Sequence, residues 1–288
     1  FMTDDVLDSV QVITCTLVGA ANRSIRHLTF ETVFIDEAAQ FSLVDAIAIA
    51  QGSKNMVLLG DPQQLTQVVQ AVHPGGVDNS ALGHYMGEQA ILDEEHGFFI
   101  EVTRRMHPEV NAPVSWLAYE GRLHSHSDAS LRSINGTRPG LTLVPVEHLG
   151  NSSHSEEEVA KVLELTAELS AKVGEEEVLI VAPYNAQVDS IRDALDAAGF
   201  NQVQVGTVDK FQGREAMAVI ISLAASSAED APRGLEFLLD RNRMNVALSR
   251  AKTNSFLVYS PALIRSRFTS VEDVKAVSRL AGLLEFAS

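Results

Sequence analysis

Short, unbroken apolar runs alternate with longer amphipathic stretches along most of this 288-residue chain. An unbroken apolar run is typical of a strand buried on both faces, and such strands occur in parallel sheets covered by helices. Helix signals separate the runs: Ser155 and Glu158 have the spacing of a capping box, and Gly174 and Gly199 each follow a predicted helix. The pattern predicts an α/β fold in which helices cover both faces of parallel sheets.

The predicted strands occupy residues 32–36, 56–60, 97–102, 141–146, 177–182, 203–207, 218–223 and 255–259. The predicted helices occupy residues 43–51, 108–119, 155–173, 186–198 and 235–249. A loop-rich stretch between residues 70 and 87 predicts a domain boundary. We therefore expect an incomplete first domain at residues 1–88, with two strands, and a complete α/β domain at residues 89–288.

The composition favours a globular protein inside the cell. Hydrophobic residues make up 45% of the chain, and no apolar run approaches the roughly 18 to 20 residues that a membrane span needs. The acidic start does not resemble a signal peptide, and the single cysteine, Cys15, cannot form an internal disulfide. We expect no membrane partner and a cytoplasmic location, or a nuclear one in a eukaryote. A net charge of −16 argues against tight non-specific binding of nucleic acid, although a local groove could still hold a strand.

Carboxylates stand at the ends of two predicted strands. The first strand ends in Asp36 and is followed by Glu37, and the second is followed by Asp61, with Gln64 three residues later. Ligands of open α/β folds bind at the carboxyl ends of the strands. Asp can hold Mg²⁺ there, and Glu can orient and deprotonate an attacking water. An acidic surface loop is the alternative for one such strand end, but the second strand end favours phosphate chemistry.

Residues 33–40 and 60–65 resemble motifs II and III of superfamily 1 helicases, in the up-frameshift-like branch that contains RNA and DNA enzymes. Further segments resemble later or neighbouring motifs of that family in the expected order: residues 14–20, 103–108, 182–187, 206–215 and 243–252. Residues 103 and 104 depart from the family pattern, with Thr and Arg in place of Gln and Tyr. The resemblance covers about residues 12–260 and implies RecA-like domains, of which the second is a complete motor domain.

The resemblance implies roles for twelve residues in ATP hydrolysis and strand binding. It assigns catalysis to Glu37, Gln64, Arg105 and Arg250, nucleotide binding to Asp36, Asp61, Gly213 and Glu215, and strand binding to Thr16, Tyr184, Asn185 and Thr207. It implies ATP and Mg²⁺ as cofactors, with Asp36 as the magnesium ligand. The two arginines would contact the γ-phosphate, where a guanidinium fork suits phosphate oxygens. Alternatives remain open: a surface ion pair for each arginine, a solvated Glu215, and a core or base-stacking ring for Tyr184.

The chain contains no Gly-Lys dipeptide and therefore no phosphate-cradling P-loop. We expect it to be the C-terminal portion of an ATP-dependent helicase that moves along single-stranded DNA or RNA, 5′ to 3′ by family analogy. The expected partners are that strand and the missing N-terminal part of the same protein, without which the chain should not hydrolyse ATP. The rest of the protein could carry a nuclease or another activity. The alternative is a non-catalytic, helicase-like module that binds nucleic acid or a protein.

Overall fold

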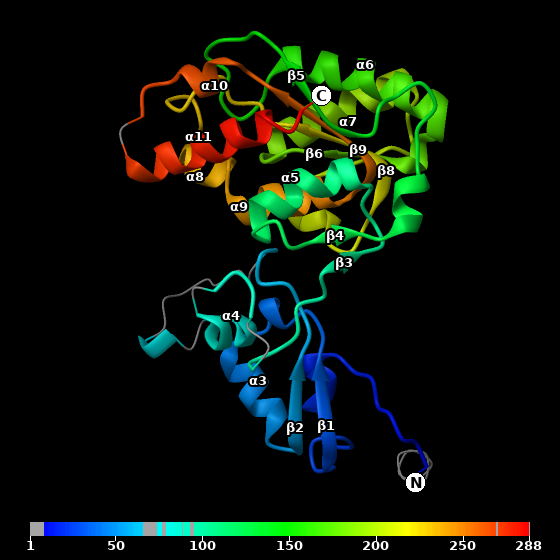
Figure 1. Cartoon of the computed structure of the whole chain (residues 1–288), viewed down its shortest axis with the longest axis vertical. Helices are drawn as coiled ribbons and strands as arrows, with labels where there is room; N and C mark the ends of the chain where they lie inside the picture. Colours follow the sequence, from blue (N-terminus) through cyan, green and yellow to red (C-terminus); the bar gives the residue numbers. More distant parts are fainter. Residues whose placement is uncertain are drawn as a thin grey trace. The chain divides into compact units, whose positions relative to one another are not determined.

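The computed structural model describes residues 9–65, 74–76, 79–87, 89–92, 95–268 and 270–287. The chain divides into two compact units, Phe1–Leu92 and Asp93–Ser288 (Figure 1). In the described part of the chain, no helix is long and apolar enough to cross a membrane.

The first unit is built around two parallel strands, β1 (Phe30–Ile35) and β2 (Ser53–Leu58). Their register places Ile35 opposite Leu58, so both strands end at the same edge. Helix α3 (Leu43–Ala50) packs on both strands, and it begins where the Ser42 hydroxyl accepts the Asp45 N–H at 3.0 Å. The unit also contains α2 (Leu17–Ala20), the 3₁₀ segments η1 (Ala38–Gln40) and η2 (Pro74–Gly76), and α4 (Ala81–Met86).

The second unit contains a five-stranded sheet in which every strand is parallel to its neighbours. In spatial order the strands are β5 (Gly140–Pro145), β9 (Ala251–Tyr259), β8 (Ala216–Ser222), β6 (Val178–Val181) and β7 (Gln204–Gly206). Helices α6 (Glu156–Val173) and α7 (Asn185–Ala198) cover one face, and α5 (Pro108–Ala118) and α9 (Arg241–Ser249) cover the other (Figure 1). The predicted α/β class, with parallel strands and covering helices, is confirmed.

Smaller elements complete the second unit. They are the paired strands β3 (Val102–Thr103) and β4 (His124–Ser125), the 3₁₀ segments η3 (Ser127–Leu131), η4 (Glu175–Glu177) and η5 (Val208–Phe211), and the helices α8 (Gly234–Leu238), α10 (Ala262–Arg265) and α11 (Val271–Leu284).

The structure corrects three local predictions. Of the strand predicted at residues 97–102, only Val102 lies in a strand, and the apolar side chains of Phe98 and Ile100 are exposed. The helix predicted at residues 235–249 is two helices, because the Asp240 carboxylate accepts the Arg243 N–H at 2.8 Å and starts α9 anew. Helix α11 was not predicted, and α4 lies inside the predicted boundary loop; residues 70–73 and 77–78 of that loop lie outside the described residues.

The predicted capping box at the start of α6 is half formed. The Ser155 hydroxyl accepts the Glu158 N–H at 3.2 Å, as expected, but the Ser155 N–H donates to Gln187 Oε1 at 2.8 Å. The carboxylate of Glu158 is fully buried and accepts from the Ser222 hydroxyl at 2.6 Å and the Ala224 N–H at 3.0 Å. Glu158 thus links α6 to the end of β8 instead of closing its own helix.

Candidate functional site

The turn that leaves β1 carries Asp36 and Glu37 in a constrained conformation. Glu37 has φ 54° and ψ 40°, in the left-handed region, where a residue with a Cβ costs about 1–3 kcal/mol. Asp36 Oδ1 accepts the Glu37 N–H at 3.0 Å, and the Gln40 amide donates to Glu37 Oε2 at 3.3 Å. Both carboxylates are exposed, so the turn presents two acids on a fixed backbone.

The turn that leaves β2 positions Gln64 through Asp61. Asp61 Oδ1 accepts the Gln63 N–H at 2.9 Å, and Asp61 Oδ2 accepts the Gln64 side-chain amide at 2.8 Å. The carboxylate therefore fixes both the backbone of this turn and the side chain of Gln64.

The two turns are in direct contact. The Ala38 N–H donates to the Leu59 carbonyl at 2.8 Å. A Cβ on Gly60 would lie 2.9 Å from the Ala38 nitrogen, so this approach requires glycine. The structure therefore brings Asp36, Glu37, Asp61 and Gln64 to the same edge of the first unit, where parallel strands bind ligands.

This edge fits a magnesium ion that arrives with phosphate. Mg²⁺ at nucleotide sites is typically held by one or two carboxylates together with phosphate oxygens and water. No group of three or more His, Cys, Asp or Glu side chains within the described ranges could hold a metal ion by itself. Asp36 offers an exposed carboxylate oxygen of the kind that Mg²⁺ prefers, and among the residues that the structure describes no closed metal cage is formed.

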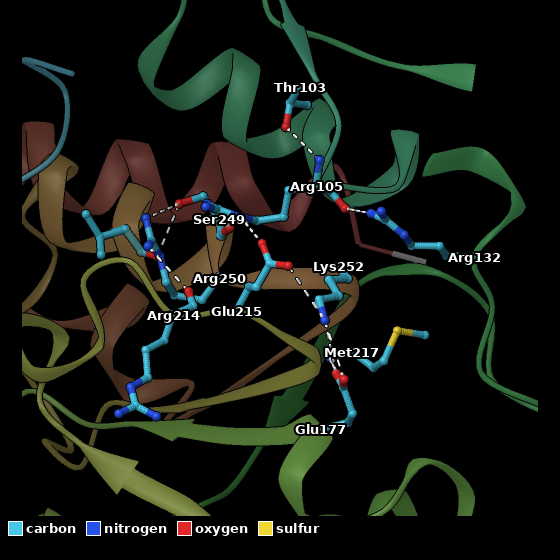
Figure 2. Close-up of polar contacts among 11 residues, drawn as sticks. Thr103, Arg105, Arg132, Glu177, Arg214, Glu215, Met217, Ser249, Arg250 and Lys252 are labelled. Atoms are coloured by element: carbon cyan, nitrogen blue, oxygen red, sulfur yellow. Dashed lines mark hydrogen bonds and ion pairs between the residues drawn. The ribbon is translucent and has the colours of Figure 1, made fainter. Parts of the chain in front are cut away.

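Arg105, in the loop between β3 and α5, is held at both its side chain and its backbone (Figure 2). Its Nε donates to Glu215 Oε2 at 2.8 Å, and its Nη1 donates to the Ser249 carbonyl at 3.2 Å. The guanidinium of Arg132 donates to the carbonyl oxygen of Arg105. The alternative of an ion pair therefore describes Arg105 correctly, but its partner, Glu215, is itself a predicted site residue.

Glu215 is surrounded by cations. Lys252 Nζ lies 3.7 Å from Glu215 Oε1, and Lys252 also lies 3.4 Å from Glu177 (Figure 2). Partial burial raises the pKa of Glu215, but the hydrogen bond and charge of Arg105, with the charges of Lys252 and Arg132, bring the pKa below its ordinary value. The carboxylate is therefore ionised at neutral pH.

Arg250 is almost fully buried, with 2% of its surface exposed, at the C-terminal end of α9. Its Nε donates to the Val246 carbonyl at 3.1 Å, and its Nη1 donates to the Arg214 carbonyl at 3.4 Å. Its Nη2 lies 3.5 Å from the Ser249 hydroxyl, the residue whose carbonyl accepts from Arg105. Arg105, Arg250 and Glu215 are therefore brought together around Ser249 (Figure 2).

The remaining nucleotide-site residue, Gly213, follows η5 with φ 77°, a conformation that favours glycine. It precedes Arg214, whose carbonyl accepts from Arg250. Thr207 is half-buried immediately before η5, and Asn185 is exposed at the start of α7. Thr16, in the first unit, is exposed and caps α2 by accepting the Gly19 N–H at 3.2 Å.

Tyr184, a predicted strand contact, is buried in this structure. The residue is 7% exposed, and the centroid of its ring lies 5.9 Å from the centroid of the Phe237 ring. Burial raises the pKa of Tyr184 to about 12, against the opposing charge of Arg233. The alternative of a core ring fits this burial, and contact of Tyr184 with a strand stays a prediction.

Three residues of the cluster around Arg105 and Glu215 were not predicted from the sequence. Lys252 lies inside the last quoted motif, at the start of β9 and two residues after Arg250, so it could have been singled out as a further cation of that motif. Glu177 and Arg132 lie outside every quoted motif. Arg132 is separated from Arg105 by 27 residues, and no local pattern predicts that contact.

Comparisons with known proteins find matches over most of the chain. Two family models match, each described as an AAA domain: one over residues 78–261 and one over residues 1–71. The chain is 29% identical over 281 residues to the Regulator of nonsense transcripts 1 homolog of Drosophila melanogaster, a match that covers 91% of this chain and 23% of that protein. It is 32% identical over 281 residues to the ATP-dependent helicase upf1 of Schizosaccharomyces pombe, covering 90% of this chain and 30% of that protein.

A third relative is the DNA polymerase alpha-associated DNA helicase A of Schizosaccharomyces pombe, 29% identical over 277 residues, covering 86% of this chain and 40% of that protein. The chain thus spans less than half the length of each of these relatives. The first family model alone matches more than half of the chain. The chain therefore belongs to the AAA-domain family, in the up-frameshift-like branch of the superfamily 1 helicases.

Proposed function

We propose that the protein to which this chain belongs hydrolyses ATP, with Mg²⁺, to move along single-stranded DNA or RNA in the 5′ to 3′ direction. The observation that carries this proposal is the convergence of Arg105 and Arg250 on Ser249 beside the ionised Glu215. Two guanidiniums gathered at one point suit the oxygens of a phosphoryl group.

In the first unit, Glu37 is the proposed base that orients and deprotonates the attacking water. Gln64 positions that water, and Asp61 holds the Gln64 amide in place through its 2.8 Å hydrogen bond. Asp36 is the proposed ligand of Mg²⁺, which when bound neutralises charge on the phosphates. The left-handed backbone of Glu37 sets the direction in which its side chain leaves the turn.

In the second unit, Arg105 and Arg250 stabilise the charge that develops on the transferred phosphoryl group. Arg105 exchanges the carboxylate of Glu215 for a phosphate oxygen when nucleotide binds, which leaves Glu215 able to accept from a ribose hydroxyl. The positive φ of Gly213 allows the backbone of this loop to approach the nucleotide closely.

Strand binding is proposed for Thr16, Asn185 and Thr207, whose hydroxyls and amide contact phosphate and sugar without reading sequence. Such contacts serve DNA and RNA alike, in keeping with relatives that are named as a DNA helicase and as regulators of transcripts. We propose that the chain alone does not turn over ATP, because it contains no P-loop to cradle the β- and γ-phosphates.

The test compares ATP turnover by the 288-residue chain with turnover by a longer protein that adds a P-loop, each with and without single-stranded DNA or RNA. We expect no turnover by the chain, and strand-stimulated turnover by the longer protein that Glu37→Gln abolishes. Turnover by the chain alone would overturn the proposed need for the P-loop. A longer protein that binds strands without hydrolysing ATP would favour the non-catalytic alternative.

A further inference from the structure

The guanidinium of Arg233 lies over the ring of Phe237, and the proposed mechanism uses neither residue. The Cζ atom of Arg233 lies 3.7 Å from the centroid of the Phe237 ring. Arg233 immediately precedes α8, and Phe237 is four residues later, a spacing that brings side chains together on one helix face. The buried side chains of Leu235 and Leu238 anchor α8 in the core, so the stacked pair has a fixed support.

The charge of Arg233 is available to a ligand. A second guanidinium, that of Arg243, lies 4.5 Å from the same ring centroid, but it also contacts the Asp209 carboxylate at 3.4 Å. Within the described ranges, Arg233 has no carboxylate within ion-pair distance, and its side chain is exposed.

The stacked pair adjoins the residues proposed for strand binding. Phe237 and Arg243 line a pocket with Pro183 and Val208. Pro183 lies two residues before Asn185, and Val208 directly follows Thr207. The same pocket includes Val181 and Ile221, near the carboxyl ends of β6 and β8, the edge at which parallel sheets bind ligands.

We propose that Arg233, held flat by Phe237, is a stacking contact for one nucleotide of the single strand. A base stacks on the outer plane of the guanidinium, and an N–H at its edge contacts a neighbouring phosphate. This inference rests on the proposed strand binding and adds a base contact to the phosphate and sugar contacts of Asn185 and Thr207. Stacking on a π-face tolerates any base, so the contact would not read sequence.

The chemistry favours arginine at this position over any other cation. A guanidinium is planar, stacks on aromatic faces and keeps donors at its edge, whereas the ammonium of lysine is a compact point charge. Single-stranded nucleic acids are bound in this way on aromatic rings and on arginine planes. Exchange of Arg233 for lysine therefore separates the stacking contribution from the charge.

The test measures binding of a fluorescent oligodeoxyadenylate to the 288-residue chain as a function of salt concentration. Arg233→Lys should weaken binding about 5-fold or more with an unchanged salt dependence, because only stacking is lost. Arg233→Gln should weaken binding further and reduce the slope of log K against log salt by about 0.7, as expected for one lost phosphate contact on a single strand. Phe237→Leu should resemble Arg233→Lys, since the guanidinium loses its support.

An abasic strand of equal length separates base stacking from backbone contact. On this strand the wild-type chain and Arg233→Lys should bind equally. The matched control is Arg122→Lys, because Arg122 is also an exposed guanidinium near an aromatic ring, 5.6 Å from the centroid of Phe99, but is paired with Glu101 at 2.6 Å. The control variant should bind both strands as the wild type does.

Failure of this inference differs from failure of the proposed function. If the wild-type chain binds the strand and Arg233→Lys binds equally well, the stacking contact is wrong while strand binding stands. An equal loss of affinity on intact and abasic strands would also overturn stacking. A wild-type chain that binds neither strand would overturn both the strand-binding proposal and this contact. Circular dichroism of each variant checks that Phe237→Leu remains folded.

Discussion

Arg105 and Glu215 form a 2.8 Å ion pair although 110 residues separate them in the sequence. The pair joins the loop before α5 to the start of β8, and Ser249 at the end of α9 completes it by accepting from Arg105 at 3.2 Å. A predicted catalytic arginine is thus already held by a predicted nucleotide-binding carboxylate.

Replacement of Glu215 by Gln should make stability less dependent on pH. Because the folded protein holds the pKa of Glu215 below its ordinary value, the carboxylate contributes stability above the unfolded-state pKa, about 4.3, and loses it as pH falls through the folded-state pKa. The difference in urea midpoint between wild type and Glu215→Gln should be largest near neutral pH and should vanish in acid. A difference that grows as the pH falls would contradict this assignment.

Replacement of Arg250 by Lys should lower ATP turnover of the longer protein by roughly 10³- to 10⁵-fold, the range known for arginine fingers. A lysine cannot donate to the Val246 and Arg214 carbonyls and to a phosphate in one plane. Steady-state turnover with saturating strand gives the measurement. Arg192→Lys is the control, since Arg192 is paired with Asp189 on the surface of α7 and should lose almost nothing.

Replacement of Asp61 by Ala should slow turnover about 10²-fold while strand affinity stays unchanged. The change releases the Gln64 amide and the Gln63 N–H, and misplacement of a positioned group by about 1 Å has a cost of that size. The experiment compares kcat and strand affinity for Asp61→Ala and Gln64→Ala. Additive losses in the double variant would show that Asp61 does not act through Gln64.

Replacement of the buried Glu158 by Ala should destabilise the second unit by about 3–5 kcal/mol, because the Ala224 N–H and the His148 side chain would lose their buried partner. Urea unfolding of the chain measures the effect. Glu164→Ala on the same helix is the matched control: Glu164 is exposed and pairs with Lys161, so its loss should cost about 0–1 kcal/mol.

The fold class was predictable because it depends on a repeated pattern. Buried strands such as Val178–Val181 are unbroken apolar runs, and the pattern identifies them without knowledge of their neighbours. The run at residues 97–102 has a similar composition, but Phe98 and Ile100 remain exposed. Composition cannot show whether a run finds a strand to pair with, which explains that error.

The site was predictable where local sequence determines it and not where tertiary contacts do. Asp36 and Glu37 follow a strand, so their place at the sheet edge follows from the strand's end. The burial of Tyr184 depends on Phe237, which comes 53 positions later. The break before α9 had a visible signal, since Asp240 is a favoured helix cap, but the apolar residues on both sides concealed it.

The carbonyl of Ser249 accepts from Arg105, and its hydroxyl contacts Arg250. One residue at the end of α9 therefore contacts both guanidiniums. Any movement of this helix end displaces the two cations together. Their contributions to the reaction should consequently be coupled, and a double-mutant cycle between them should give a large interaction energy. The two arginines then behave as a single electrostatic unit whose position is set by the last turn of one helix.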